Sequence, residues 1–309
     1  MIIVIGEALI DLIRDKNNHD EYKAIVGGAN ANVAIALARV NAPHTFLARI
    51  STDSFGQQIT EKLNKNKVNT DHGITTDEPT TLAVVSIQPS GSASYSFYVN
   101  GTADWGWTPE ELPNLDAKAI QFGCLTMAME PGNLVIEKWA KAQANEKTIS
   151  HDINMRPALG FDQEKERARV ERVNEFSHII KASDEDLEWL YPNQTPEQTA
   201  KDWSKDKLVL VTRGADGTDV YKNQELLFNV PSRKIEVKDT VGAGDTFTAN
   251  LMAQLLENNH LGNNPQDKLQ AIPNETLHEY IRIAGIAASI TCERVGAEPP
   301  TLDELSKQL

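Results

Sequence analysis

The sequence of 309 residues has two cysteines, no long hydrophobic run and no block of basic residues. Cys124 and Cys292 lack the C-x-x-C spacing of a zinc or redox site, so we expect both to be buried, reduced thiols. The longest apolar runs, such as "MIIVIG", fall far short of the roughly 20 residues that span a bilayer. The first residues also lack the basic flank and cleavage site of a secretion signal. We therefore expect a cytoplasmic protein with no membrane segment.

Acidic residues outnumber basic ones, 44 to 30, which gives the chain a formal charge of −14 at pH 7. No run of five or more Lys or Arg residues offsets this excess, so we expect neither nucleic acid nor a membrane surface as a partner. The densest charge run, residues 163–176, alternates acids and bases in a way that is typical of a solvated helix face. Small molecules are the expected partners.

Strand and helix patterns alternate along most of the chain. A β-rich run at residues 2–6 precedes an amphipathic helix at 30–40, and a strand at 44–50 precedes a helix at 54–66. Further strands are expected at 119–125, 148–154, 178–183, 208–213 and 235–237. A long final helix at 275–292 should pack on the sheet. The alternation predicts an α/β fold, with a mostly parallel sheet covered on both faces and ligands at the carboxyl ends of its strands.

One segment breaks this alternation. The β-rich runs "TTLAVVSI" (80–87) and "ASYSFYV" (93–99) are separated by "QPSGS" (88–92), a Pro/Gly/Ser turn. The pattern predicts an antiparallel hairpin inserted into the α/β body.

The stretch "DTVGAGDTF" (239–247) opens a helix whose apolar side carries Phe247, Leu251 and Leu255. Glycines 242 and 244 let backbone N–H groups converge on an anion at the positive end of this helix. No Gly-Lys-Ser/Thr follows, and the glycines come late in the chain, so neither a Walker loop nor a dinucleotide fingerprint is indicated. Asp245 in this setting is either a catalytic base or an acid that caps the helix.

At this point the sequence resembles the ribokinase-like, or PfkB, family of sugar kinases. "GGANANVAIALARVNAPHTFLARISTDSFG" (27–56) is similar to the N-terminal signature of that family, and "DTVGAGDTF" is similar to the C-terminal one. "SFYVNGTADW" (96–105) and "DINMRP" (152–157) resemble the fructokinase branch. The resemblance implies a ribokinase-like fold with a small β-sheet lid over the sugar. The core would comprise 1–10, 28–74 and 106–309, and the lid would comprise 11–27 and 75–105.

The resemblance also implies an activity, namely ATP-dependent transfer of the γ-phosphate to a primary hydroxyl of a free sugar. D-fructose, giving fructose 6-phosphate, is the first choice. Asp245 would be the base, and the backbone of Gly242, Ala243, Gly244 and Asp245 would form the anion hole. Thr212 and Gly214 would approach ATP. The residues implied at the sugar are Asp11, Gly28, Asn32, Phe97, Ala103, Asn154, Arg156 and Asp245. For Phe97 strand packing is the alternative, and for Arg156 a surface salt bridge.

Two cations are implied by the same resemblance. The family pattern Asn-x-x-Glu is replaced here by Ser183-Asp184-Glu185-Asp186, in which Asp186 would be a water-mediated Mg²⁺ ligand. A helix cap by Ser183 is the alternative. A K⁺ site would be built largely from backbone carbonyls near Asp239, Val241, Thr291, Arg294 and Gly296.

Other functions remain open at this stage. Within the family these are ribokinase, nucleoside kinase and 2-keto-3-deoxygluconate kinase, although Val99 and Asn100 stand where an acid sugar would favour arginine. From another class, the protein would be a catalytically silent sugar or nucleotide sensor. A Rossmann oxidoreductase is disfavoured because "VIGEAL" has a single glycine. The edge of the hairpin favours a homodimer paired through the lid.

Overall fold

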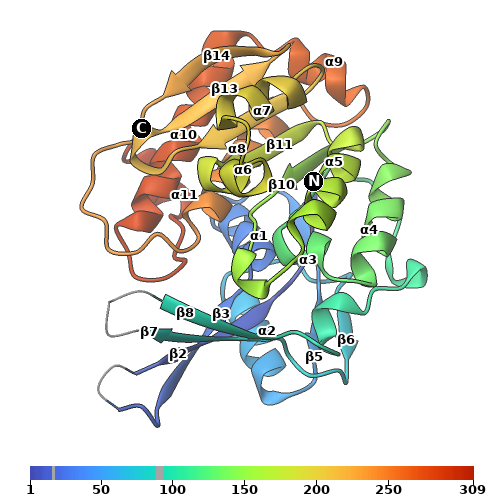
Figure 1. Cartoon of the computed structure of the whole chain (residues 1–309), viewed down its shortest axis with the longest axis vertical. Coiled ribbons are helices and arrows are strands. Elements are labelled where there is room, and N and C mark those ends of the chain that lie inside the picture. The colour runs from blue at the N-terminus through green and yellow to red at the C-terminus, as the bar shows by residue number, and fades with distance from the viewer. Residues whose placement is uncertain (16–17, 88–92) are drawn as a thin grey trace.

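A computed structural model of the chain describes residues 1–15, 18–87 and 93–309, and its largest element is an eight-stranded sheet (Figure 1). The strands are β1 (Ile2–Ile5), β4 (His44–Leu47), β9 (Ala119–Gly123), β10 (Thr148–Asp152), β11 (Ile179–Ser183), β12 (Leu208–Thr212), β13 (Thr218–Lys222) and β14 (Glu225–Val230). Their order is β14-β13-β12-β11-β10-β9-β1-β4. All pairs from β4 to β12 are parallel, and β13 and β14 add an antiparallel edge. The carboxyl ends of β1, β9, β10, β11 and β12 therefore share one edge.

Helices cover the sheet. They are α1 (Ala29–Arg39), α2 (Ser54–Lys65), α3 (Cys124–Ala128), α4 (Gly132–Lys141), α5 (Gln163–Phe176), α6 (Asp184–Leu190), α7 (Pro196–Trp203), α8 (Ala243–Glu257), α9 (Pro265–Gln270), α10 (Asn274–Cys292) and α11 (Leu302–Ser306). Short 3₁₀ turns are η1 (Ala103–Trp105), η2 (Pro109–Glu111), η3 (Pro157–Leu159) and η4 (Gly214–Asp216). Within the described ranges, no helix combines the length and hydropathy needed to cross a bilayer.

Strand β1 shows how one sheet is buried on two faces. Successive side chains of a strand point to opposite sides, and here Ile2 and Val4 pack in the cluster that contains residues of α1, α8 and α10. Ile3 and Ile5 pack in a second cluster with residues of α4 and α5. All four side chains are fully buried. The mostly parallel, doubly covered sheet that the sequence predicts is confirmed.

A four-stranded sheet stands apart from these layers, at the bottom of Figure 1. It contains β3 (Tyr22–Gly27), β2 (Leu9–Arg14), β7 (Leu82–Ile87) and β8 (Ala93–Tyr98), in the order β3-β2-β7-β8. Strands β7 and β8 are antiparallel, as the hairpin prediction requires, and the expected turn at 88–92 lies outside the described residues. A two-stranded sheet pairs β5 (Arg49–Ser51) with β6 (Ile74–Thr76).

Two strand predictions were wrong. The run 44–50 is divided at Ala48, because β4 joins the large sheet whereas β5 pairs with β6. The run 235–237 forms no strand; there the chain passes the end of α10, where the amides of Lys238 and Asp239 donate to the Cys292 carbonyl. Val237 is exposed, so its apolar character does not reflect burial in a sheet.

The burial of the two cysteines and of helices α5 and α10 agrees only in part with the expectations. Cys124 is buried, but Cys292 is only partly buried. Helix α5 has the solvated face that was expected, but two of its charged residues, Glu166 and Arg169, form a buried ion pair 2.7 Å long. The final helix α10 does enter the core, since Tyr280 packs in the cluster that includes sheet residues.

Candidate active site

The starts of two helices from opposite ends of the chain meet at the carboxyl edge of the large sheet. Asn32 lies in the first turn of α1, and Asp245 lies in the first turn of α8. Asn32 Nδ2 donates to Asp245 Oδ2 across 2.8 Å, although the two residues are 213 positions apart. Both side chains are buried. The two sequence signatures therefore form one site.

Helix α1 is held in place by a carboxylate that the sequence did not single out. Gly28 precedes the helix with φ 106° and has no side chain to cap it. Glu7, fully buried in the loop after β1, accepts hydrogen bonds from the amides of Ala29 (2.9 Å) and Asn30 (3.4 Å). It also accepts from Asn30 Nδ2 at 2.9 Å and from the Thr126 hydroxyl. The position of Glu7, directly after the apolar run at residues 2–6, was the sequence signal that could have identified it.

Helix α8 begins with free backbone donors. Gly242 adopts the left-handed conformation, with φ 77°, and no side chain caps the helix. The amide of Ala243 donates to the Thr240 carbonyl at 3.3 Å. Within the described ranges no such partner is found for the amides of Gly244 and Asp245. Two N–H groups at the positive end of a 15-residue helix are thus available to an anion.

The environment of Asp245 favours a base that works near neutral pH. Burial raises the pKa of its carboxyl to about 7, and the charge of Asp152 adds to the rise. The hydrogen bond from Asn32 and the charges of Lys181 and Arg156 act in the opposite direction on this pKa. A carboxylate with such a pKa exchanges a proton readily under physiological conditions.

Asp152 and Lys181 were missed by the sequence analysis. Asp152 ends β10, Lys181 lies opposite it in the neighbouring strand β11, and the two form a buried ion pair 2.7 Å long. A lysine inside the apolar run "HIIKAS" was the signal that could have identified one of them.

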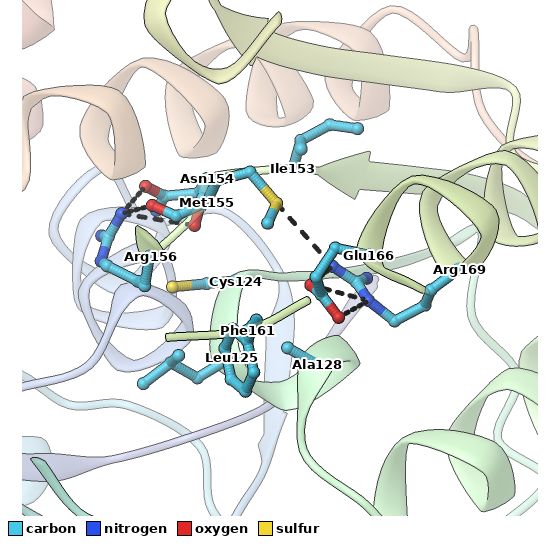
Figure 2. A pocket seen from close by; sticks show the side chains of 10 residues that line it. All are labelled: Cys124, Leu125, Ala128, Ile153, Asn154, Met155, Arg156, Phe161, Glu166 and Arg169. Atoms are coloured by element: carbon cyan, nitrogen blue, oxygen red, sulfur yellow. Dashed lines mark hydrogen bonds and ion pairs between the residues drawn. The ribbon is translucent and has the colours of Figure 1, made fainter. Parts of the chain in front are cut away.

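Arg156 and Asn154, two of the residues expected at the sugar, contact each other. Arg156 Nη1 donates to Asn154 Oδ1 at 2.6 Å and to the Met155 carbonyl at 2.8 Å, and these residues line a small hollow (Figure 2). The residue is only partly exposed and forms no ion pair with a carboxylate in the described part of the chain. The surface salt bridge considered for Arg156 is therefore wrong.

Asp11 shares this electrostatic environment. It is half-buried on β2, and a Cβ built at Gly27 would lie 2.3 Å from its Oδ2, so glycine gives the carboxylate its space. Burial raises the pKa of Asp11 to about 6, and the charge of Arg156 opposes the rise. Arg156 acts on Asp11 and on Asp245 alike, so the three side chains border one region.

Phe97 and Ala103 lie on the side of this region formed by the small sheet. Phe97 packs against a cluster that contains Trp105 and Cys124, and Cys124 also lines the hollow beside Arg156. Ala103 is buried, and its carbonyl accepts from Arg49 Nε at 2.9 Å. The packing role considered for Phe97 is real, and a contact with sugar stays a prediction.

Thr212 and Gly214 are the two residues that were expected to approach ATP. Thr212 ends β12 opposite Ser183 of β11, and its hydroxyl donates to the Ala182 carbonyl at 3.4 Å. Gly214 opens a 3₁₀ turn and has open space around its Cα. Within the described ranges no hydrogen bond joins either residue to Asp245, so their role stays a prediction.

Ser183 caps α6, as the alternative considered from the sequence has it, and Asp186 completes the capping box. Its Oδ2 accepts from the Ser183 amide at 2.8 Å, and Ser183 Oγ accepts from the Asp186 amide at 3.0 Å. Its Oδ1 accepts from the Met155 amide at 2.7 Å and ties α6 to the segment after β10. Each carboxylate oxygen keeps a second lone pair, which fits a ligand that binds Mg²⁺ through water. The Mg²⁺ role stays a prediction.

The segments expected at the K⁺ site do come together. Asp239 accepts from the Val241 amide at 3.1 Å and from the Gly296 amide at 2.8 Å, which joins the start of α8 to the loop after α10.

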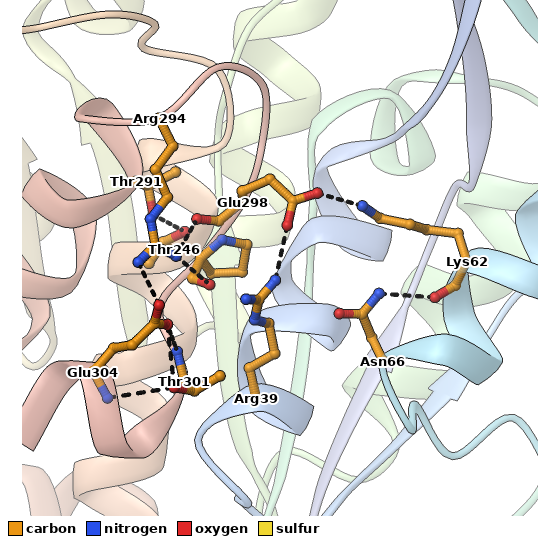
Figure 3. Close-up of polar contacts among 10 residues, drawn as sticks. Arg39, Lys62, Asn66, Thr246, Thr291, Arg294, Glu298, Thr301 and Glu304 are labelled. Carbon is orange, nitrogen blue, oxygen red and sulfur yellow. Dashed lines mark hydrogen bonds and ion pairs between the residues drawn. The ribbon is translucent and has the colours of Figure 1, made fainter.

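Figure 3 shows the neighbouring contacts in the same region. The Thr291 hydroxyl donates to the Thr246 hydroxyl at 3.0 Å. Arg294 Nη1 donates to the carbonyls of Glu298 and Pro299, each at 3.3 Å. The loop is thus held by side chains as well as by backbone, and its binding of K⁺ stays a prediction.

A family model described as "pfkB family carbohydrate kinase" matches residues 1–304. The chain belongs to this family. A fructokinase of Rhizobium leguminosarum bv. trifolii is 37% identical over 84% of this chain and 81% of its own length. A probable fructokinase of Arabidopsis thaliana is 31% identical over 97% of this chain and 92% of its own. Among solved structures, Xylella fastidiosa fructokinase with bound ATP has a TM-score of 0.88 at 25% identity, covering 99% of this chain and 97% of that one.

These comparisons confirm the PfkB family and the ribokinase-like fold that the two signatures implied, and the likeness to fructokinases that residues 96–105 and 152–157 implied.

We expect Glu7→Ala to destabilise the protein by about 3–5 kcal/mol, because buried donors at the start of α1 and on Thr126 lose their acceptor. Chemical denaturation followed by circular dichroism measures the change. The exposed Glu146, replaced by Ala, is the control and should shift the free energy of unfolding by less than about 0.5 kcal/mol. Equal stability of the two variants would contradict the anchoring role.

We expect Asp245→Asn to become progressively more stable than the wild type as pH rises. Between the unfolded pKa of 3.8 and the folded value of about 7, the native wild type binds more protons than the unfolded chain. Its stability therefore declines over that range, by up to roughly 4 kcal/mol, and levels off above it. Urea denaturation of both proteins between pH 4 and pH 8 measures the difference, and a difference that does not change with pH would contradict it.

Proposed function

We propose that the chain is a fructokinase that transfers the γ-phosphate of ATP to the 6-hydroxyl of D-fructose. The observation that carries the proposal is the buried carboxylate of Asp245 beside the unpaired first-turn amides of α8. The fructokinase relatives, and the Xylella protein with bound ATP, support the choice of sugar and nucleotide.

The chemistry follows from this arrangement. As the sugar oxygen forms its bond to the γ-phosphorus, Asp245 accepts the hydroxyl proton. The bond from the γ-phosphorus to the oxygen that bridges it to the β-phosphorus breaks, and ADP leaves with that electron pair. The amides of Gly244 and Asp245 donate to the oxygens of the transferred group, where negative charge is held during transfer. Asn32 fixes the orientation of the Asp245 carboxylate throughout.

Two cations would add positive charge to the site. Mg²⁺ bound with ATP would neutralise phosphate charge, and Asp186 is the residue that would hold one of its waters. K⁺ would be held near Asp239, Val241 and Gly296, where it would stabilise the loop that precedes α8.

The sugar would lie between the core and the small sheet. Asp11 and Arg156 offer an acceptor and donors to neighbouring hydroxyls, and Asn154 holds the guanidinium in place. Phe97 would cover the apolar face of the sugar from the small sheet, which acts as a lid that excludes water. The division into core and lid stays a prediction.

Cytoplasmic location and a lid-mediated dimer also stay predictions. Strands β3 and β8 are the two edges of the small sheet, and each exposes a tyrosine, Tyr22 (47%) and Tyr98 (62%). Unpaired edges with aromatic side chains favour pairing between two subunits.

Purified protein incubated with Mg-ATP and a panel of sugars and nucleosides tests the activity. We expect ADP formation to be fastest with D-fructose and the product to be fructose 6-phosphate. Ribose or an acid sugar as the best substrate would move the protein to another branch of the family. Absence of sugar-dependent ADP formation with every ketose, aldose and nucleoside would overturn the proposal and favour a silent sensor.

In the same assay, Asp245→Asn should lower kcat about 10²–10⁴-fold with little change in ligand affinity, because it removes the base and keeps the shape. Asp267→Asn is the matched control, since Asp267 also lies in the first turn of a helix, α9, but outside the site. Its kcat should equal that of the wild type. A capping role alone would leave both variants active.

A further inference from the structure

Lys181 is a buried lysine of β11 whose ammonium group lies beside the first turn of α8. Lys181 and Asp152 are paired in register on β11 and β10. Lys181 Nζ contacts Asp152 Oδ1 at 2.9 Å and Oδ2 at 2.7 Å, and the two side chains are 8% and 7% exposed. Burying two charges requires desolvation that their attraction offsets only in part, so an ion pair of this kind is weak evidence of a stabilising role.

Helix α8 fixes this pair from a second direction. Asp152 Oδ2 also accepts a hydrogen bond from the Thr248 hydroxyl at 3.0 Å. A Cβ built at Gly244 would lie 3.3 Å from Lys181 Nζ, so the ammonium group sits directly beside the first turn of the helix. The absence of a side chain at 244 leaves the space around the ammonium open.

The ammonium group has a donor to spare. It carries three N–H groups, of which the two oxygens of Asp152 account for two. In the described part of the chain, every hydrogen bond of Lys181 Nζ goes to Asp152. The ammonium group lies beside Gly244, whose amide also has no hydrogen-bond partner in that part of the chain. A fixed positive charge and free amides therefore lie together at the start of α8.

We propose that Lys181 is a catalytic residue that contacts the phosphoryl group in transfer, and that Asp152 and Thr248 are the residues that position it. The inference rests on the proposed kinase function. Asp245 takes the proton of the sugar hydroxyl, and Lys181 contributes a charge and a hydrogen bond to the oxygens of the transferred group. Because Asp152 holds it in place beforehand, little reorganisation accompanies the reaction. A side chain at position 244 would approach the ammonium group closely and displace it by a few tenths of an ångström.

Lys181→Met, Lys181→Arg and Lys222→Met test the proposal, with folding checked by circular dichroism and thermal melting. Lys222 is the matched control, because it is equally buried and donates to the carbonyls of Leu269 and Gln270, at the end of α9. For each protein, kcat and both KM values are measured, and the affinities for Mg-ATP and Mg-ADP are measured by calorimetry without sugar.

We expect Lys181→Met to lower kcat by about 100-fold, leave the KM for fructose within a few-fold, and weaken ATP binding about 10-fold while ADP binding is unchanged. Lys181→Arg keeps the charge and should recover part of kcat and the preference for ATP. Lys222→Met should melt at a lower temperature with unchanged kcat per folded molecule. These differences separate a contact with the transferred group from a loss of packing.

Two results would overturn the assignment. One is a Lys181→Met enzyme that melts earlier but keeps kcat within twofold of the wild type; the other is equal weakening of ATP and ADP. If Lys181→Met does not fold, loss of the ATP preference in a folded Lys181→Arg enzyme also contradicts the assignment. A wild type without sugar-dependent ADP formation would overturn the proposed function instead, and the ATP and ADP affinities would still decide the contact made by Lys181.

Discussion

The contact between Asn32 and Asp245 is the constraint on which the site depends. It requires α1 and α8 to begin at the same edge of the sheet, which the parallel order of the central strands provides. A second link acts nearby, where Glu298 accepts from Arg39 of α1 at 2.8 Å and from Lys62 of α2 at 2.5 Å. The loop after α10 is thereby tied to the N-terminal helices, and the start of α8 lies between them.

Charge within the site opposes the charge of the whole molecule. The chain carries a formal charge of −14, which repels a polyanion such as ATP. Lys181, Arg156 and the free amides of α8 present positive charge at the one place where phosphate would be held. Asp152 and Asp245 lie beside these groups and offset part of their positive charge. The positive groups are thus concentrated locally although the chain as a whole is acidic.

Most helices and strands followed from periodicity, because alternating and helical apolar patterns reflect burial on a sheet or helix face. The errors occurred where the residues favour a strand but their backbone does not pair with the expected neighbour. Residues 44–50 are apolar enough for one strand, yet the chain changes sheets at Ala48. Residues 235–237 have β propensity without a neighbouring strand to pair with. Helix α5 has the expected solvated face, but the charge pattern did not reveal that Glu166 and Arg169 pair on its buried side.

The sequence by itself determined the family and most of the alternation of strands and helices, and it placed Asp245 at a helix start, because two long signatures with glycines at fixed spacing mark the family and the beginning of α8. The tertiary structure decided which residues support that start. Glu7 reaches Thr126 across 119 positions, and Asp152 reaches Lys181 across 29. Such partners depend on strand register and on which loop follows which strand, and no local pattern in the sequence records either.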